Sequence, residues 1–282
     1  RMDFIPGSNE VMIQQLNRLQ NTNQVWIGNT VDMQLKLLLT DKDSAWVDIH
    51  DDIVWLDNNK AFTWTSEKDG WVHLYRVSRD GKDMKLITKG NFDVVNINCI
   101  DPAGGYVYYI ASPDNFTQRY LYRSRLDGKG EAERVSPADM PGQHSYQISA
   151  DAKYAIHSFD NAVTPRRISL INLGTHKEIK LLEDNTALKA RINELGLRPK
   201  EFFKVDIGPV VLDGWMIKPI NLDPQKKYPI ICHVCGEPAG STVQDNWNTG
   251  DNMWHQYLAN ELGVLVVSID NRGTKVPRRR KF

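Results

Sequence analysis

Short apolar runs recur along the first 183 residues, and their order repeats at a period of about 45–47 residues. Each copy holds three runs rich in aromatic and β-branched residues, a composition typical of short strands. Three clear copies begin at Phe62, Val107 and Tyr154, and a fainter one begins at Val11. The runs are 62–66, 73–77 and 85–88; 107–112, 120–124 and 133–136; 154–158, 167–171 and 179–182; and 11–14, 25–27 and 35–39 in the fainter copy.

A period in this range is typical of the blades of a β-propeller. The runs are separated by turn residues such as Asp80-Gly81, Asp127-Gly128 and Asp57-Asn58-Asn59, which accept positive φ angles at low cost. We therefore interpret residues 1–183 as about four blades of a partial propeller. The strands alone leave an ordinary antiparallel sandwich open as the alternative.

The pattern changes after residue 183. Asn185 is a good helix N-cap residue, apolar residues stand at helical spacing from Leu188 to Leu195, and Gly196 suits the C′ position. The elements expected next are strands at 201–205 and 210–217, a buried strand within 228–235, a helix over 251–262 and a strand at 264–270. This alternation predicts that residues 184–282 begin a second, α/β domain.

The amino-acid composition argues against several classes of function. The hydrophobic fraction of 41% is that of a globular protein with a sizeable core. The 35 basic residues balance 35 acidic ones, which argues against a general role on nucleic acids or membrane surfaces. The basic run at 278–281 is interpreted as a solvated tail rather than a nucleic-acid patch. No apolar run reaches the length of a transmembrane helix, and three cysteines are too few for a disulfide scaffold.

Cys232 and Cys235 form a C-x-x-C pair. Such a pair suits redox chemistry when one sulfur lies at a helix N-terminus, or zinc when further ligands join it. Only Cys99, His233 and His255 could supply the further ligands that zinc needs. The first cysteine lies in an apolar run and the second opens a loop, so a buried small thiol at Cys232, without metal or redox chemistry, is the preferred interpretation.

Two other candidates favour structural roles. His255 shares a predicted helix with Tyr257 and Leu258, and we interpret it as a histidine of the helix face rather than a catalytic one. Glu67 and Asp69 lie in a turn between strands, where two carboxylates have no cleft to share. None of the serines has a glycine two positions away on each side, so the G-x-S-x-G nucleophile elbow of α/β hydrolases is absent from the sequence.

Several stretches, taken together and in this order, resemble the dipeptidyl peptidase IV group of the prolyl oligopeptidase family of serine peptidases, in its bacterial form. These stretches are 4–10, 14–18, 65–71, 212–215, 236–240 and 270–274. The resemblance covers essentially the whole chain. It implies an eight-bladed propeller that caps an α/β-hydrolase domain, with residues 1–183 as the C-terminal half of the propeller and 184–282 as the start of the hydrolase domain.

The resemblance also implies a reaction. Such enzymes release Xaa-Pro or Xaa-Ala dipeptides from peptide N-termini by acyl transfer on a Ser-His-Asp triad. The positions of the triad fall beyond Phe282, and those of the paired glutamates that hold the substrate amine fall before Arg1. The chain is therefore expected to be a fragment that is inactive alone and truncated before the nucleophile.

Two residues are expected at or near the site. Relatives place a tyrosine in the loop after the first core strand, where its hydroxyl donates to the oxyanion, and Cys235 holds that position here. A thiol is a weak and short donor, so activity is expected to be impaired. The loop that carries His50 approaches the substrate from the propeller side in relatives, which makes His50 a candidate contact.

By the same resemblance, the parent protein is expected to be a periplasmic or secreted homodimer that acts on peptides. No cofactor, metal, nucleic acid or membrane segment is expected. The alternative is a propeller that serves as a non-catalytic binding module, or a pseudoenzyme.

Overall fold

The structure is a computed structural model that describes residues 1–235, 240–247 and 249–274. It divides into two compact units: Arg1–Tyr108 with Arg123–Glu133, and Tyr109–Tyr122 with the chain from Arg134 onward. The predicted tight loop at 236–239 and the basic run at 278–281 lie outside the described residues. The predicted boundary between residues 183 and 184 stays a prediction.

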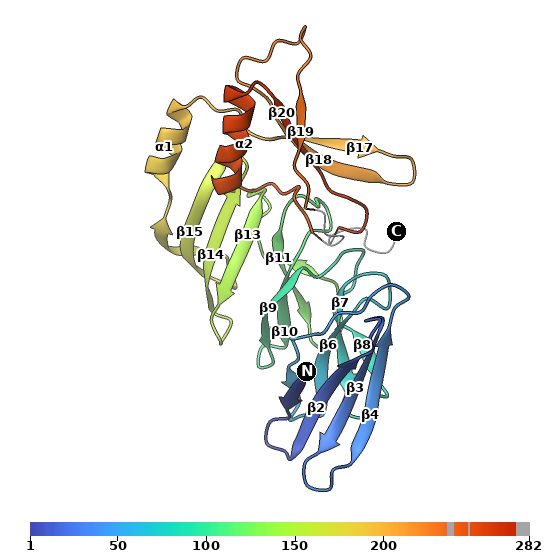
Figure 1. The fold of residues 1–282 in the computed structure, drawn as a ribbon. Coiled ribbons are helices and arrows are strands. Elements are labelled where there is room, and N and C mark those ends of the chain that lie inside the picture. The colour runs from blue at the N-terminus through green and yellow to red at the C-terminus, as the bar shows by residue number, and fades with distance from the viewer. Residues whose placement is uncertain (236–239, 248, 275–282) are drawn as a thin grey trace. The chain divides into compact units, whose positions relative to one another are not determined.

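Four sheets of four strands follow one another along residues 2–183, as Figure 1 shows. Each strand pairs with its neighbours in the chain, and neighbouring strands of the first, second and fourth sheets run antiparallel. The strands are β1 (Met2–Phe4), β2 (Glu10–Leu16), β3 (Thr22–Asn29) and β4 (Leu35–Lys42); β5 (Trp55–Leu56), β6 (Ala61–Ser66), β7 (His73–Ser78) and β8 (Met84–Leu86); β9 (Asn96–Asp101), β10 (Tyr106–Ala111), β11 (Tyr120–Arg125) and β12 (Glu133–Arg134); β13 (Gln143–Ile148), β14 (Tyr154–Asn161), β15 (Thr164–Asn172) and β16 (Glu178–Glu183).

These sheets confirm the predicted repeat of short strands, and they add one strand to each copy. The added strands are β1, β5, β9 and β13, each at the start of its sheet. β1 and β5 are only three and two residues long. β9 and β13 mix polar with apolar residues, so neither produces a continuous apolar run in the sequence. The repeat is therefore a four-stranded meander rather than a three-stranded one.

The core of the first unit lies between the faces of its sheets. Trp64 and Phe62 of β6 are completely buried, and they pack in one cluster with Met12, Val25 and Val77. The indole nitrogen of Trp64 donates to Asp41 Oδ2 at 3.0 Å. This bond satisfies two buried polar groups that would otherwise be costly to leave without partners.

The turns have the backbone that their residue types predict. Asp57, Asn58 and Asn59 all have positive φ, at 51°, 54° and 64°. Gly81 has φ 75°, and a Cβ at this position would collide with the carbonyl oxygen of Leu38. Only glycine fits there, because both the backbone angle and the space exclude a side chain.

Helix α1 (Thr186–Glu194) begins and ends where the sequence predicts. Asn185 is the N-cap residue, although its side chain donates to Arg166 O at 2.6 Å instead of capping the helix. Gly196 has φ 60°, and its N–H donates to Asn193 O. No residue of α1 is fully buried, so this helix is only loosely packed against the rest of the second unit.

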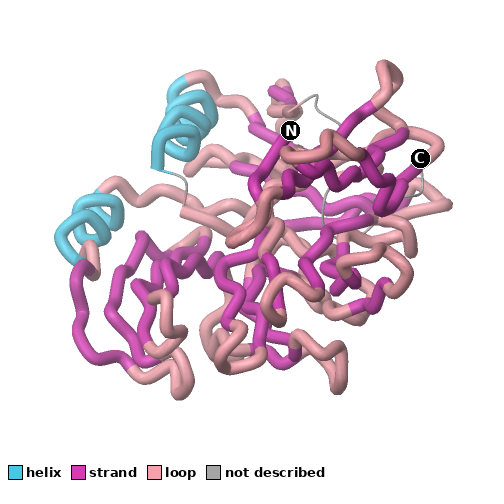
Figure 2. The backbone as a smooth tube through the Cα atoms, turned by 90° about the horizontal axis from the view of Figure 1, so that it is seen from below, coloured by secondary structure: helices cyan, strands magenta, loops and turns pink. Residues whose placement is uncertain are grey.

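The second unit also contains a mixed sheet in the order β17-β18-β20-β19. Its strands are β17 (Glu201–Asp206), β18 (Val211–Ile217), β19 (Ile230–Cys232) and β20 (Leu265–Ile269). β19 and β20 are parallel, and helix α2 (Thr249–Glu261) connects them and packs on β18 and β20. Figure 2 shows α1 and α2 in cyan.

One expectation for this sheet is wrong. The run at 228–235 was expected to be a buried strand, but only Ile230–Cys232 is a strand and all three residues are exposed. β19 is at the edge of the sheet and pairs only with β20. Nothing else among the described residues covers it, so the apolar side chains of Ile230 and Ile231 are 59% and 37% exposed.

Candidate functional site

Cys235, the predicted oxyanion position, lies in the second unit three residues after the end of β19 and is exposed. Cys232, at the end of β19, is exposed as well, and neither cysteine forms a disulfide. The expected burial of the thiol in the apolar run, Cys232, is therefore wrong. β19 is an edge strand, and among the described residues no element covers its outer side.

The segment that follows the predicted oxyanion loop is held by Asp270, directly after β20. Its carboxylate accepts hydrogen bonds from the hydroxyl of Ser241 at 2.7 Å and from the backbone N–H groups of Thr242 and Val243 at 2.7 and 3.1 Å. A carboxylate with several N–H and O–H donors fixes a loop strongly, because charge-assisted bonds are the stronger ones. Asp270 belongs to the stretch 270–274 that carries the resemblance, but the sequence did not reveal this role.

Ser268 of β20 connects the same loop to the sheet. Its hydroxyl donates to His233 O at 2.7 Å and lies 2.6 Å from the hydroxyl of Thr242. The backbone on both sides of residues 236–239 is therefore tied to the end of β20.

His50 lies in the first unit, and its position is set by Gln14. The side-chain amide of Gln14 donates to His50 O at 2.7 Å, and its oxygen accepts from His50 N at 3.1 Å. The imidazole packs edge-on against Trp64, with ring centroids 4.8 Å apart. His50 is thus half-buried and well ordered by its neighbours, and a substrate contact for it stays a prediction.

The two histidines considered as zinc ligands, His233 and His255, lie together. Their ring centroids are 4.8 Å apart, and both rings contact Trp215. Burial lowers the pKa of His255, and His233 lowers it further. No group of three or more potential ligands suited to a metal occurs among the described residues. The prediction that His255 packs on the helix face agrees with its burial against Trp215.

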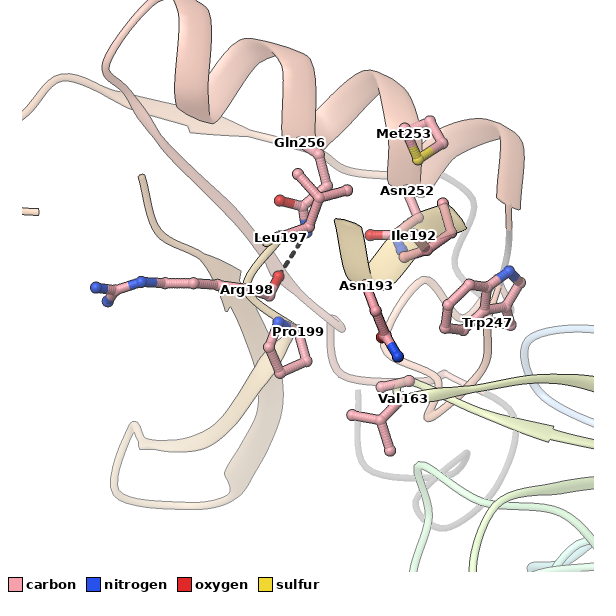
Figure 3. A pocket seen from close by; sticks show the side chains of 11 residues that line it. Val163, Ile192, Asn193, Leu197, Arg198, Pro199, Trp247, Asn252, Met253 and Gln256 are labelled. Atoms are coloured by element: carbon pink, nitrogen blue, oxygen red, sulfur yellow. Dashed lines mark hydrogen bonds between the residues drawn. The ribbon is translucent and has the colours of Figure 1, made fainter. Parts of the chain in front are cut away.

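Two cavities open in the second unit. The first, about 180 Å³, is lined by α1, α2 and the turn after β14, and Figure 3 shows Ile192, Leu197 and Met253 around it. In the same view Gln256 donates to Arg198 O, at 2.6 Å. The second cavity, about 170 Å³, is lined mainly by polar side chains, among them Lys200 and His255. Neither cavity was foreseen, because its lining comes from segments far apart in the sequence.

A sequence model described as the N-terminal region of dipeptidyl peptidase IV matches residues 1–166. The match covers more than half of the chain. The chain belongs to the dipeptidyl peptidase IV family.

Curated relatives agree with this family. The chain is 28% identical over 280 residues to "Probable dipeptidyl-aminopeptidase B" of Emericella nidulans, covering 94% of this chain and 30% of that protein. It is 26% identical over 287 residues to dipeptidyl-aminopeptidase B of Aspergillus niger, covering 96% and 31%. The chain thus spans about a third of the length of these relatives.

Among solved structures, the crystal structure of Porphyromonas gingivalis dipeptidyl peptidase 4 has a TM-score of 0.85 and 28% identity, over 98% of this chain and 38% of that one. The four-stranded sheets of this chain correspond to the N-terminal propeller region of that family. Among the described residues, no helix is long and apolar enough to cross a membrane. The roles of Cys235 and His50 stay predictions.

Proposed function

We propose that this chain is part of a serine-type dipeptidyl peptidase that releases Xaa-Pro or Xaa-Ala dipeptides from peptide N-termini. In this proposal residues 1–183 form the C-terminal half of the propeller, and residues 184–282 begin the α/β-hydrolase domain. The observation that supports it most strongly is the match to one dipeptidyl peptidase 4 over 98% of the chain at a TM-score of 0.85.

The hydrolase assignment has independent support in the second unit. β19, α2 and β20 form a parallel strand–helix–strand unit. Parallel strands joined by a covering helix are typical of α/β domains, in which loops at the carboxyl ends of the strands carry the chemistry. Cys235 and Asp270 both follow such strand ends, which is where an oxyanion donor and its support are expected.

In the proposed reaction a thiol takes the place of a phenol at the oxyanion. Cys235 donates weakly, and loss of one oxyanion donor costs about 2.7–4 kcal/mol, or roughly 10²–10³ in rate. Because the sequence also lacks a G-x-S-x-G elbow, we expect the 282-residue chain to be inactive alone. The parent polypeptide is proposed to act on peptides as a homodimer outside the cytoplasm.

The test is hydrolysis of a Gly-Pro chromogenic amide. The 282-residue chain is expected to show no turnover, whereas a polypeptide that includes the triad turns the substrate over slowly. In that longer polypeptide Cys235→Tyr is expected to raise kcat by roughly 10²–10³, and Cys235→Ala, the control, leaves it near the parent value. No turnover by the longer polypeptide, with or without Cys235→Tyr, would favour a non-catalytic binding module, the alternative suggested by the thiol at this position.

A further inference from the structure

The polar cavity of the second unit has a half-buried cation, Lys200, in its wall. Lys200 lies just before β17, and its ammonium donates to Asn246 Oδ1 at 3.1 Å and lies 5.4 Å from the centre of the Trp215 ring. No ion pair joins Lys200 to a carboxylate in the part of the chain that the structure describes. An ammonium has three N–H donors, so Lys200 retains donor capacity for a further partner.

An acidic side chain lines the same cavity. Asp251 lies in the first turn of α2 and acts electrostatically on both Lys200 and His255. A carboxylate has about four lone-pair sites, which lets Asp251 accept a ligand in addition to its own contacts. Burial lowers the pKa of His255, which favours its neutral form. Among the side chains that line the cavity, Lys200 is positive and Asp251 negative, and Asp245 and Asp160 outside the lining also act on Lys200.

Neutral hydrogen-bonding groups and flat rings complete the lining. Gln244 and Asn252 offer amide groups, and Trp215 and His255 present ring surfaces. A simple anion would be attracted by Lys200 but repelled by Asp251. A simple cation would be attracted by Asp251 but repelled by Lys200. A small molecule with both charges satisfies both side chains at once, because opposite charges in a half-buried site attract more strongly than in water.

We propose that this cavity binds a small zwitterion, a free α-amino acid or a dipeptide, with its carboxylate on Lys200 and its ammonium on Asp251. The cavity volume of about 170 Å³ accommodates either ligand. The two ligands share their end groups and differ in the separation of the charges, so glycine and glycylglycine distinguish them. This inference goes beyond the proposed peptidase activity and does not rest on it, since every residue involved lies within the described second unit.

The experiment is isothermal titration calorimetry of the 282-residue chain at pH 7.5 with glycine, glycylglycine, acetate and methylammonium. Saturable heat with glycine or glycylglycine, and at least tenfold weaker binding of acetate and methylammonium, is expected. Lys200→Met is expected to weaken binding of the zwitterion roughly tenfold to a hundredfold, the effect of one charge-assisted hydrogen bond. The control Lys180→Met removes an exposed lysine of β16 and is expected to change nothing.

A second variant keeps the test decisive if Lys200→Met does not fold. Asp251→Asn is expected to weaken glycine binding at least tenfold. Acetate is then expected to bind this variant as tightly as glycine does, or more tightly, because the negative charge that repels acetate is gone. Asp139→Asn, at an exposed position outside the cavity, is the matched control. Absence of saturable heat with both zwitterions, or equal binding of zwitterion and acetate by the unsubstituted chain, would overturn the proposal.

Discussion

A buried pair of histidines in the fourth sheet makes the stability of this protein sensitive to acid. His144 of β13 and His157 of β14 are each 3% exposed, and their ring nitrogens lie 2.9 Å apart. The rings are nearly parallel, at 10°, with centroids 5.1 Å apart. This separation is that of two coplanar rings joined end to end by a straight hydrogen bond.

Neighbouring groups determine which nitrogen carries the proton. His144 Nε2 lies 2.8 Å from Met140 O, which only accepts, so Nε2 is the protonated nitrogen and Nδ1 is the acceptor. His157 Nε2–H therefore donates to His144 Nδ1. A proton added to Nδ1 of His144 would face the N–H of His157 unless His157 moves its own proton to Nδ1. The charged and titratable groups around the pair include His176, Arg134, Arg167 and Tyr146, which packs on both rings, and no carboxylate is among them.

The size of the effect follows from proton linkage. Burial lowers the pKa of His144 to about 4 and that of His157 to about 3, from the ordinary histidine value of 6.5. Both folded values lie below the unfolded value, so the unfolded chain binds protons first and stability falls as the pH drops below 6.5. Between pH 6.5 and 4.5 the loss is about 2 kcal/mol for each histidine, hence about 4 kcal/mol for the pair. The decline levels off below pH 3, when the folded pair is also protonated.

Urea denaturation followed at pH 6.5, 5.5 and 4.5 measures this loss. The window lies above the range in which the depressed pKa of Asp127, lowered by Arg125, affects stability. The double variant His144→Phe/His157→Phe keeps the ring volume and is expected to lose most of the pH dependence. An unchanged dependence in the double variant, or a stability that is flat from pH 6.5 to 4.5 in the unsubstituted chain, would refute the reasoning.

Three further predictions concern single contacts and one surface. Asp270→Ala is expected to cost about 3 kcal/mol, because it leaves the N–H groups of Thr242 and Val243 without an acceptor; urea denaturation and faster amide exchange at these two residues check it, with Asp139→Ala as control. Trp64→Phe is expected to cost about 2 kcal/mol by removing the donor to buried Asp41, a loss visible as a lower Tm, and an unchanged Tm would contradict it. The exposed apolar edge at Ile230 and Ile231 is expected to drive concentration-dependent association of the 282-residue chain; sedimentation velocity measures it, Ile231→Lys is expected to reduce it, and a clean monomer at all concentrations would argue against it.

The periodic part of the fold was predictable from the sequence, since strand runs such as 62–66 carry local signals of β-branched and aromatic composition between turn residues. The first strand of each sheet was not, because β1 and β5 are only three and two residues long and β9 and β13 mix polar with apolar residues. The burial of β19 was predicted incorrectly for a different reason. An apolar run indicates a strand that is suited to burial, whereas its actual burial depends on the elements that cover it.

The contacts of the candidate site were even less predictable from the local sequence. A strand end followed by Asp270-Asn271-Arg272-Gly273-Thr274 was noticed for its resemblance, yet nothing local indicates that the carboxylate collects donors from residues 241–243, about 28 positions earlier. The pairing of His144 with His157 is likewise a product of strand register. Contacts of this kind depend on tertiary packing, and a single sequence does not carry their distances.

At the predicted oxyanion position, the backbone that supports the donor group and the donor group itself are in different condition. The frame is complete on both described sides of residues 236–239, because Asp270 holds the segment from Ser241 and Ser268 holds His233 O. The donor is reduced to the thiol of Cys235, which is exposed. An exposed position accepts a larger side chain without the overpacking cost of a core site. Tyrosine at residue 235 would therefore test the donor alone, and an equally stable but no more active Cys235→Tyr variant of the longer polypeptide would mean that residue 235 does not face the oxyanion.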